Sequence, residues 1–231
     1  HALLYYKTDP FAVPWTSKNY FHTNNWEILE MARILNEKGY WVDVIDKNAN
    51  IADLDLKNQY DLCICLGDGN PLKNFAQLAE KTKKAKKVLY TTGMEPRLSR
   101  RLVAERYLYF HKRHPARNVK IQRMPVNVNL LDVAHDIDAF FCIGNEDTMQ
   151  EYKKYGRPIH RIYPSTSPDI ETKMSFEKKD SKKILYFGGS GNIEKGLDLV
   201  IEAVIGLPDA ELYICAPEKE GEFNSIYKDI I

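Results

Sequence analysis

The sequence has no long apolar run and no marked excess of one charge. No stretch approaches the roughly 18 consecutive apolar residues that a membrane-spanning helix needs, so it predicts no transmembrane segment. The start, His1-Ala-Leu-Leu-Tyr-Tyr, lacks the basic region and small-residue cleavage site of a secretory signal. The 33 Lys and Arg nearly balance the 32 Asp and Glu. We therefore expect a soluble, cytoplasmic protein.

Cysteine is scarce, and its spacing does not indicate a metal site. The four cysteines, Cys63, Cys65, Cys142 and Cys215, each lie within an apolar, strand-like run. A C-x-C pair can ligate metal, but no His or Cys partner stands at a zinc-like spacing from it. The sequence predicts four buried free thiols of a reducing compartment and no bound metal.

The glycine fingerprint of dinucleotide-binding enzymes is also missing. Such enzymes carry G-x-G-x-x-G after the first strand, where this chain has Thr8-Asp9-Pro10. We therefore do not expect a nicotinamide or flavin cofactor.

Short apolar strands alternate with amphipathic helices along the chain. Strands are expected at residues 2–6, 40–45, 62–66, 88–92, 139–143 and 159–163, and helices at 24–38, 72–84, 97–110 and 147–155. Strands separated by helices of about 10 to 15 residues favour a parallel sheet that is covered on both faces. Right-handed crossovers make this an α/β, doubly wound, Rossmann-like domain.

A second domain begins near the C-terminus. Residues 166–182 are polar and charged, come soon after Pro164 and contain Pro168. They are typical of a linker after an N-terminal domain at 1–165. Residues 183–231 begin a second Rossmann-like domain but supply only about two strands and two helices, fewer than a complete domain. We expect this incomplete sheet to have open edges that favour packing against another copy in a homo-oligomer.

The run from Lys183 to Ala203 indicates a buried strand, a glycine-rich turn and a helix. Glycines at 188, 189 and 191 let backbone N–H groups approach an anion without obstruction by Cβ atoms. Lys195 adds positive charge where the helix N-terminus already favours phosphate. The pattern suits a diphosphate, although a plain strand-to-helix turn would need the same glycines. The helix positions expected to face the sheet are Leu197, Val200, Ile201 and Val204.

The wider string ILYFGGSGNIEKGLDLVIEAVIGLPDAELYICAPEKEGEF, over roughly residues 183–223, resembles the start of the C-terminal domain of group 1 (family 4) glycosyltransferases. The resemblance implies a GT-B fold and retaining transfer of a hexosyl group from a nucleotide-diphosphate sugar to an acceptor hydroxyl. It places the donor diphosphate at Gly189, Ser190, Gly191 and Lys195. The nucleotide sugar is a co-substrate, and no metal or other cofactor is implied.

Two departures from the family pattern leave a second hypothesis open. Family members usually carry an Arg five or six residues before the Lys, where this chain has Ser190 and Gly189. The family's later acidic motif E-x7-E, expected further along the second domain, is not found after residue 223. We read the chain as ending within the second domain and expect it to be inactive by itself. The alternative is a non-catalytic binding or scaffold protein on the same fold, and the sequence identifies no catalytic residue.

In doubly wound sheets, ligands bind beyond the carboxyl ends of the strands. On the first domain this rule selects polar residues that could equally be helix caps or turn residues. They are Thr8, Asp9, Asp68, Glu95, Asn145 and Glu146. The resemblance adds His22, because that junction lines the acceptor cleft in the family. The acceptor-side candidates are therefore His22, Asp68, Glu95 and Arg97.

Residues 97–123 form a basic segment, with nine Lys or Arg against the single acid Glu105. Such asymmetry is typical of a surface that meets an anionic partner, although a solvated helix face would look the same. Tyr107, Tyr109 and Phe110 are interleaved with the charges, which suits a membrane interface. We expect an anionic acceptor or the inner face of a membrane as partner. We expect no nucleic acid, because no recognition motif is present.

Overall fold

The computed structural model describes residues 1–12, 23–117, 119–164, 182–216 and 227. The chain divides into two compact units: His1–Leu98 with Pro125–Thr172, and Ser99–Met124 with Lys173–Ile231. This division differs from the domain boundaries expected from sequence. Residues 99–124 belong to the second unit, although they precede the last strands of the first. The expected linker falls almost entirely outside the described residues.

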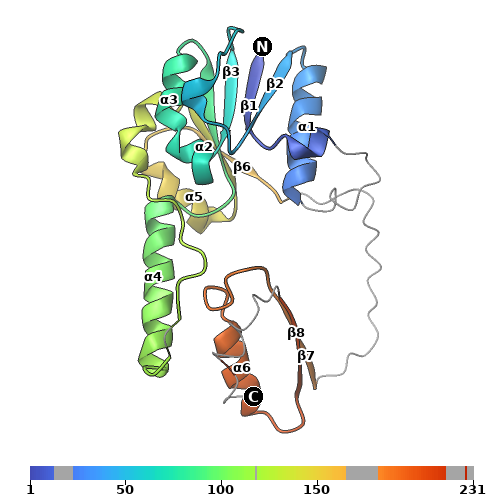
Figure 1. Cartoon of the computed structure of the whole chain (residues 1–231), viewed down its shortest axis with the longest axis vertical. Coiled ribbons are helices and arrows are strands. Elements are labelled where there is room, and N and C mark those ends of the chain that lie inside the picture. Colours follow the sequence, from blue (N-terminus) through green and yellow to red (C-terminus); the bar gives the residue numbers. More distant parts are fainter. Residues whose placement is uncertain (13–22, 118, 165–181, 217–226, 228–231) are drawn as a thin grey trace. The chain divides into compact units, whose positions relative to one another are not determined.

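The first unit is a six-stranded, fully parallel sheet in the order β2-β1-β3-β4-β5-β6. The expected α/β, Rossmann-like class is confirmed (Figure 1). Its strands are β1 (Ala2–Tyr6), β2 (Val42–Asp46), β3 (Leu62–Leu66), β4 (Lys86–Thr91), β5 (Ala139–Ile143) and β6 (Ile159–Ile162).

The helices of the first unit are α1 (Thr23–Glu37), α2 (Gly69–Lys73), α3 (Phe75–Lys81) and α5 (Glu146–Lys153). Short 3₁₀ turns are η1 (Asp9–Phe11), η3 (Ile51–Asp53), η4 (Leu130–Asp132) and η5 (Ala134–Asp136). The helix expected at 72–84 is instead two short helices that meet at Asn74. Helix α4 (Pro96–Arg113) begins in the first unit and continues in the second.

Strand β1, second from one edge of the sheet, is buried on both faces, as an interior parallel strand should be. Because side chains alternate along a strand, Leu3 and Tyr5 pack with α2, α3 and α5, whereas Leu4 and Tyr6 pack with α1. We call the second side the α1 face. Among the described helices, α1 alone contributes to the apolar cluster on that face.

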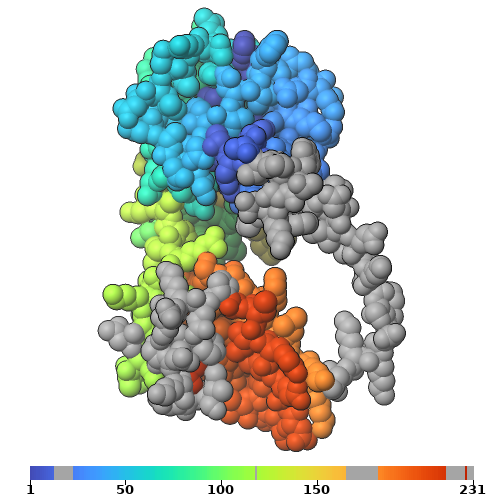
Figure 2. Space-filling view, turned by 45° about the vertical axis from the view of Figure 1, so that its right-hand side comes forward, coloured from blue at the N-terminus to red at the C-terminus, as the bar shows by residue number. Residues whose placement is uncertain are grey.

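The second unit contains a parallel β-α-β motif: β7 (Lys183–Phe187), α6 (Leu197–Ile205) and β8 (Glu211–Cys215). These residues form the orange-red surface in Figure 2. One side of the strand pair contributes Tyr186 to a core with Leu197 and Ile201 of α6. The opposite side leaves Leu185 and Phe187 67% and 80% exposed.

Cys215 lies on the exposed part of β8, whereas Cys63, Cys65 and Cys142 are buried, and all four are free thiols. The prediction of four buried thiols is therefore wrong for Cys215. Its strand is apolar, but no described element covers that side of the two-stranded sheet.

Much of the basic segment packs inside the second unit. Tyr107 and Phe110 are 3% and 1% exposed and join the core formed with α6. Arg106 and Arg113 form ion pairs with Asp198, which is fully buried at the start of α6. The α6 acids thus neutralise part of the basic charge within the chain itself.

The same pairing extends one turn further along α6. Glu202 accepts hydrogen bonds from Arg113 at 3.1 Å and contacts the imidazole Nε2 of His114 at 2.7 Å. The His114 side chain is thus part-buried, with 19% of it exposed. Among the described residues, no helix is long and apolar enough to cross a bilayer.

Candidate functional site

The strand order of the first unit has one topological switch point, between β1 and β3. From β1 the chain crosses to β2 on one side, and from β3 it continues through β4, β5 and β6 on the other. Ligands of doubly wound sheets bind at this point, outside the carboxyl ends of the strands. The loops after β1 and β3 are therefore the first places to examine.

The loop after β1 is a network of polar contacts. The Lys7 ammonium donates to Asn25 Oδ1 at 2.6 Å and pairs with Asp9 at 3.2 Å. The Thr8 hydroxyl donates to Asp46 Oδ2 at 3.2 Å. Burial acts to raise the pKa of Asp46, but hydrogen bonds from Asn48 and Thr8 outweigh it and hold that pKa below its ordinary value.

Thr8 and Asp9 thus lie at the expected edge, and both contact other side chains there. The sequence analysis did not select Lys7, the one Lys or Arg among the described residues 7–12 of this loop. Its position directly after a buried strand was the signal that could have found it.

The loop after β3 begins at Gly67, whose backbone packs closely against β4. A Cβ on Gly67 would lie 2.8 Å from Thr91 Cγ2 and 3.1 Å from the Tyr90 carbonyl oxygen, so only glycine fits. Asp68 follows with an exposed side chain that accepts from the Gly69 N–H at 2.7 Å, at the start of α2. The predicted candidate Asp68 is therefore a helix cap that solvent can reach.

Glu95, by contrast, is fully buried. Its carboxylate accepts from the Leu98 N–H at 2.9 Å and the Tyr155 hydroxyl at 2.8 Å, and Lys154 lies 3.6 Å away. Burial and the hydrogen bond to Glu95 raise the pKa of Tyr155, so its hydroxyl remains a donor. Glu95 holds the first turn of α4 against α5.

The remaining candidates of the first unit do not gather at one point. Arg97 is exposed and donates to Asn129 Oδ1 at 3.4 Å. Asn145 caps α5 by accepting from the Thr148 N–H at 3.0 Å, with Glu146 in the first turn of that helix. His22 lies outside the described residues.

In the second unit, the glycine-rich turn connects β7 to α6. Its conformation depends on glycine, because Gly191 and Gly196 have φ angles of +91° and +79°. The Lys195 Nζ lies only 2.7 Å from where a Cβ on Gly189 would stand. The lysine side chain therefore folds back over the turn, as an anion site requires.

A second basic residue, Arg123, has its backbone and Cβ beside the same turn and comes from a distant part of the chain. The Arg123 Cβ is 3.8 Å from the position of a Cβ on Gly191, and the Arg123 side chain is exposed. Its backbone N–H donates to Glu194 Oε1 at 3.0 Å, which fixes the chain at this position. The sequence survey counted Arg123 within the basic segment but could not place it next to residues 188–195.

The turn also contains buried acceptors. Glu194 Oε1 accepts from the Tyr107 hydroxyl at 3.0 Å. Its other oxygen, Oε2, and Asn192 Oδ1 are buried without a hydrogen-bond partner among the described residues. Phosphate oxygens are held by donors, so Lys195, Arg123 and the backbone N–H groups would bind the anion.

Among the described residues, no group of three or more His, Cys, Asp or Glu lies close enough together to hold a metal ion. Comparison of the chain with protein-family models, curated proteins and solved structures finds no match.

Proposed function

We propose that the chain is part of a glycosyltransferase that moves a hexosyl group from a nucleotide-diphosphate sugar to an acceptor hydroxyl. The observation that carries this proposal is that the Lys195 ammonium lies at the glycine-rich turn and that the backbone of Arg123 is anchored beside it. Lys195 folds over Gly189, and Arg123 stands beside Gly191. In this proposal Arg123 takes the place of the arginine that family members carry five or six residues before the Lys. The lack of that arginine in the local sequence was the reason for the scaffold alternative.

The chemistry follows from where charge develops. When the bond between the anomeric carbon and the diphosphate breaks, its electron pair leaves with the diphosphate, which gains negative charge. The acceptor oxygen bonds to the anomeric carbon, and its proton passes to the leaving diphosphate. Donors that are already in place stabilise that charge without reorganisation. The Arg123 guanidinium would supply a planar fork and Lys195 a mobile point charge, and both suit phosphate oxygens. Retention at the anomeric carbon rests on the family resemblance.

On the acceptor side, the proposal uses the two candidates with exposed side chains, Asp68 and Arg97. Arg97 suits an anionic acceptor. Glu95 is enclosed by Leu98, Tyr155 and Lys154, so we assign it the cap of α4 rather than a contact with substrate.

The test is amide NMR of the chain titrated with UDP-, GDP- and ADP-glucose. We expect at least one donor to shift the Gly188, Gly189 and Gly191 amides, with a dissociation constant on the order of 1 mM. Lys195→Ala and Arg123→Ala should each weaken binding about tenfold, as loss of a charge-assisted hydrogen bond does.

Lys182→Ala is the matched control, because Lys182 is an exposed lysine that precedes β7 and pairs with Asp209 at 3.1 Å. It should leave binding unchanged. If no sugar nucleotide shifts the glycine amide signals at a concentration 10-fold above the expected dissociation constant, the transferase proposal is wrong. The non-catalytic alternative is then favoured.

A further inference from the structure

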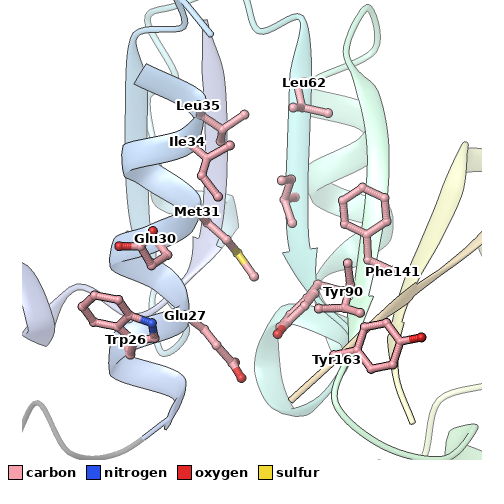
Figure 3. A pocket seen from close by; sticks show the side chains of 12 residues that line it. Trp26, Glu27, Glu30, Met31, Ile34, Leu35, Leu62, Tyr90, Phe141 and Tyr163 are labelled. Atoms are coloured by element: carbon pink, nitrogen blue, oxygen red, sulfur yellow. The ribbon is translucent and has the colours of Figure 1, made fainter. Parts of the chain in front are cut away.

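The first unit contains an apolar groove that the proposed transfer reaction does not use. It has a volume of about 440 Å³ and runs between α1 and the sheet (Figure 3). On α1, Glu27, Met31 and Leu35 follow one another at intervals of four residues and so share one side of the helix. Leu62, Tyr90 and Phe141 line the opposite wall from three neighbouring strands.

The groove is polar at one end and apolar at the other. Leu35 and Leu62 lie at one end, and Glu27 and Tyr90 lie at the end where the strands finish (Figure 3). Leu35 is eight positions after Glu27, which corresponds to about 12 Å along the helix axis. A pocket of this size, with a mostly apolar lining and a few convergent polar groups, is typical of small-molecule sites.

The polar end is organised around the Glu27 carboxylate, which is 9% exposed. The Tyr6 hydroxyl donates to Glu27 Oε2 at a long 3.5 Å. Burial, followed by the nearby Glu27 carboxylate, raises the pKa of both Tyr6 and Tyr90. Both phenols therefore stay protonated and can act only as donors toward the carboxylate.

Two phenol donors leave acceptor capacity on Glu27, because a carboxylate offers about four lone-pair sites. The neighbouring charges are already compensated: Glu30 pairs with Arg33 at 2.8 Å, and Lys7 pairs with Asp9. The charge presented inside the groove is thus that of a buried carboxylate. Such a group favours a cationic donor and disfavours an anion.

We propose that this groove binds an amphipathic amine, with its ammonium on Glu27 and a linear apolar body lying along Met31 and Ile34 toward Leu35 and Leu62. Glu27 and Leu35 are about 12 Å apart along the helix axis. An extended chain of about ten carbons, with C–C bonds of about 1.5 Å, spans about 11 Å and suits this length. The site is independent of the glycine-rich turn, because every lining residue belongs to the first unit.

The test compares three probes with the same body: decylamine, decanol and decanoate, each kept below its micelle concentration. Methyl NMR should show shifts confined to the methyl groups that line the groove, those of Met31, Ile34, Leu35, Leu62, Ile64 and Ile162. Affinity should fall from the amine to the alcohol to the carboxylate. Glu27→Gln should weaken decylamine at least tenfold and change decanol less than threefold. Glu37→Gln is the control, since Glu37 lies on the same helix outside the groove.

A bulky side chain should block all three probes. Met31→Trp fills the middle of the groove, and Ile34→Trp provides a milder block if the first variant fails to fold, because Ile34 is 47% exposed. Sedimentation without probe tests whether a second copy occupies the groove.

Three results would overturn the proposal: decanoate binding as tightly as decylamine, Glu27→Gln leaving decylamine affinity intact, or self-association that shifts the groove methyls.

Discussion

The buried carboxylate of Asp198 offers the sharpest test of how the second unit is held together. Asp198 is fully buried and forms ion pairs with both Arg106 and Arg113. Replacing it by Asn keeps the volume but leaves two guanidinium groups without their shared counter-charge. Removing one partner of a buried ion pair costs about 3–5 kcal/mol.

We expect the lower end of that range for Asp198→Asn. The Arg106 and Arg113 side chains are 16% and 20% exposed, so water compensates part of the loss, and Arg113 keeps its contact with Glu202. A loss of about 3 kcal/mol corresponds to roughly a 100-fold change in the local opening equilibrium. The change should be confined to the second unit, because none of these contacts involves the first.

Hydrogen exchange measured by mass spectrometry resolves the two units separately, which a single unfolding curve would not. Amide protection in α6 and in residues 99–113 should fall about 100-fold, while β1 and β3 stay unchanged. Glu105→Gln is the control, because its pair with Arg101 is 60% and 68% exposed and contributes little. If α6 keeps its protection within about threefold in Asp198→Asn, the ion pairs do not hold this unit together.

Three further predictions concern single residues. Burial acts to raise the pKa of Glu202, but bonds from His114 and Arg113 outweigh it and lower that pKa. The ionised Glu202 carboxylate therefore stabilises the folded protein fully at pH values above its ordinary pKa of about 4.5. This stabilisation is lost as the pH falls through the lower pKa that Glu202 has in the folded protein. Glu202→Gln should flatten the acid side of the stability–pH curve, and an unchanged acid side would contradict this.

Gly67→Ala should destabilise the first unit by about 1–3 kcal/mol through overpacking. Gly93→Ala, with no atom within 4 Å of its Cβ position, should be close to neutral, and equal melting temperatures would refute the packing argument. Burial raises the pKa of Cys63 to about 11, so a thiol reagent should modify only Cys215 quickly in the native protein. If two or more cysteines reacted quickly, the assignment of Cys63, Cys65 and Cys142 as buried would be wrong.

Apolar spacing in the sequence predicts the positions of strands and helices well where those positions depend only on neighbouring residues in the chain. The strand at 139–143 and the strand at 62–66 were predicted with the bounds that the structure shows, because apolar runs of that length bounded by turn residues have few other solutions. The helix at 72–84 was predicted as one element because its apolar spacing is continuous, whereas the structure divides it at Asn74.

The candidate site was predicted only in part. The glycine-rich turn and Lys195 are legible in the sequence because they are adjacent, and their geometry supports the anion site. Arg123 could not be placed there, since it contacts a segment about 70 residues further along the chain. The sequence likewise predicts that the basic segment forms a surface, because the acid that pairs with Arg106, Asp198, lies 92 residues away in the chain.

The sequence by itself therefore determined the α/β class, most strand and helix positions and the turn between β7 and α6. These follow from side-chain periodicity and from the backbone freedom of glycine, which act over a few residues. The tertiary structure alone decided that residues 99–124 join the second unit, that Arg123 meets the glycine-rich turn, and that a groove ending at Glu27 opens on the α1 face. Each of these depends on packing between distant segments, which no local pattern records.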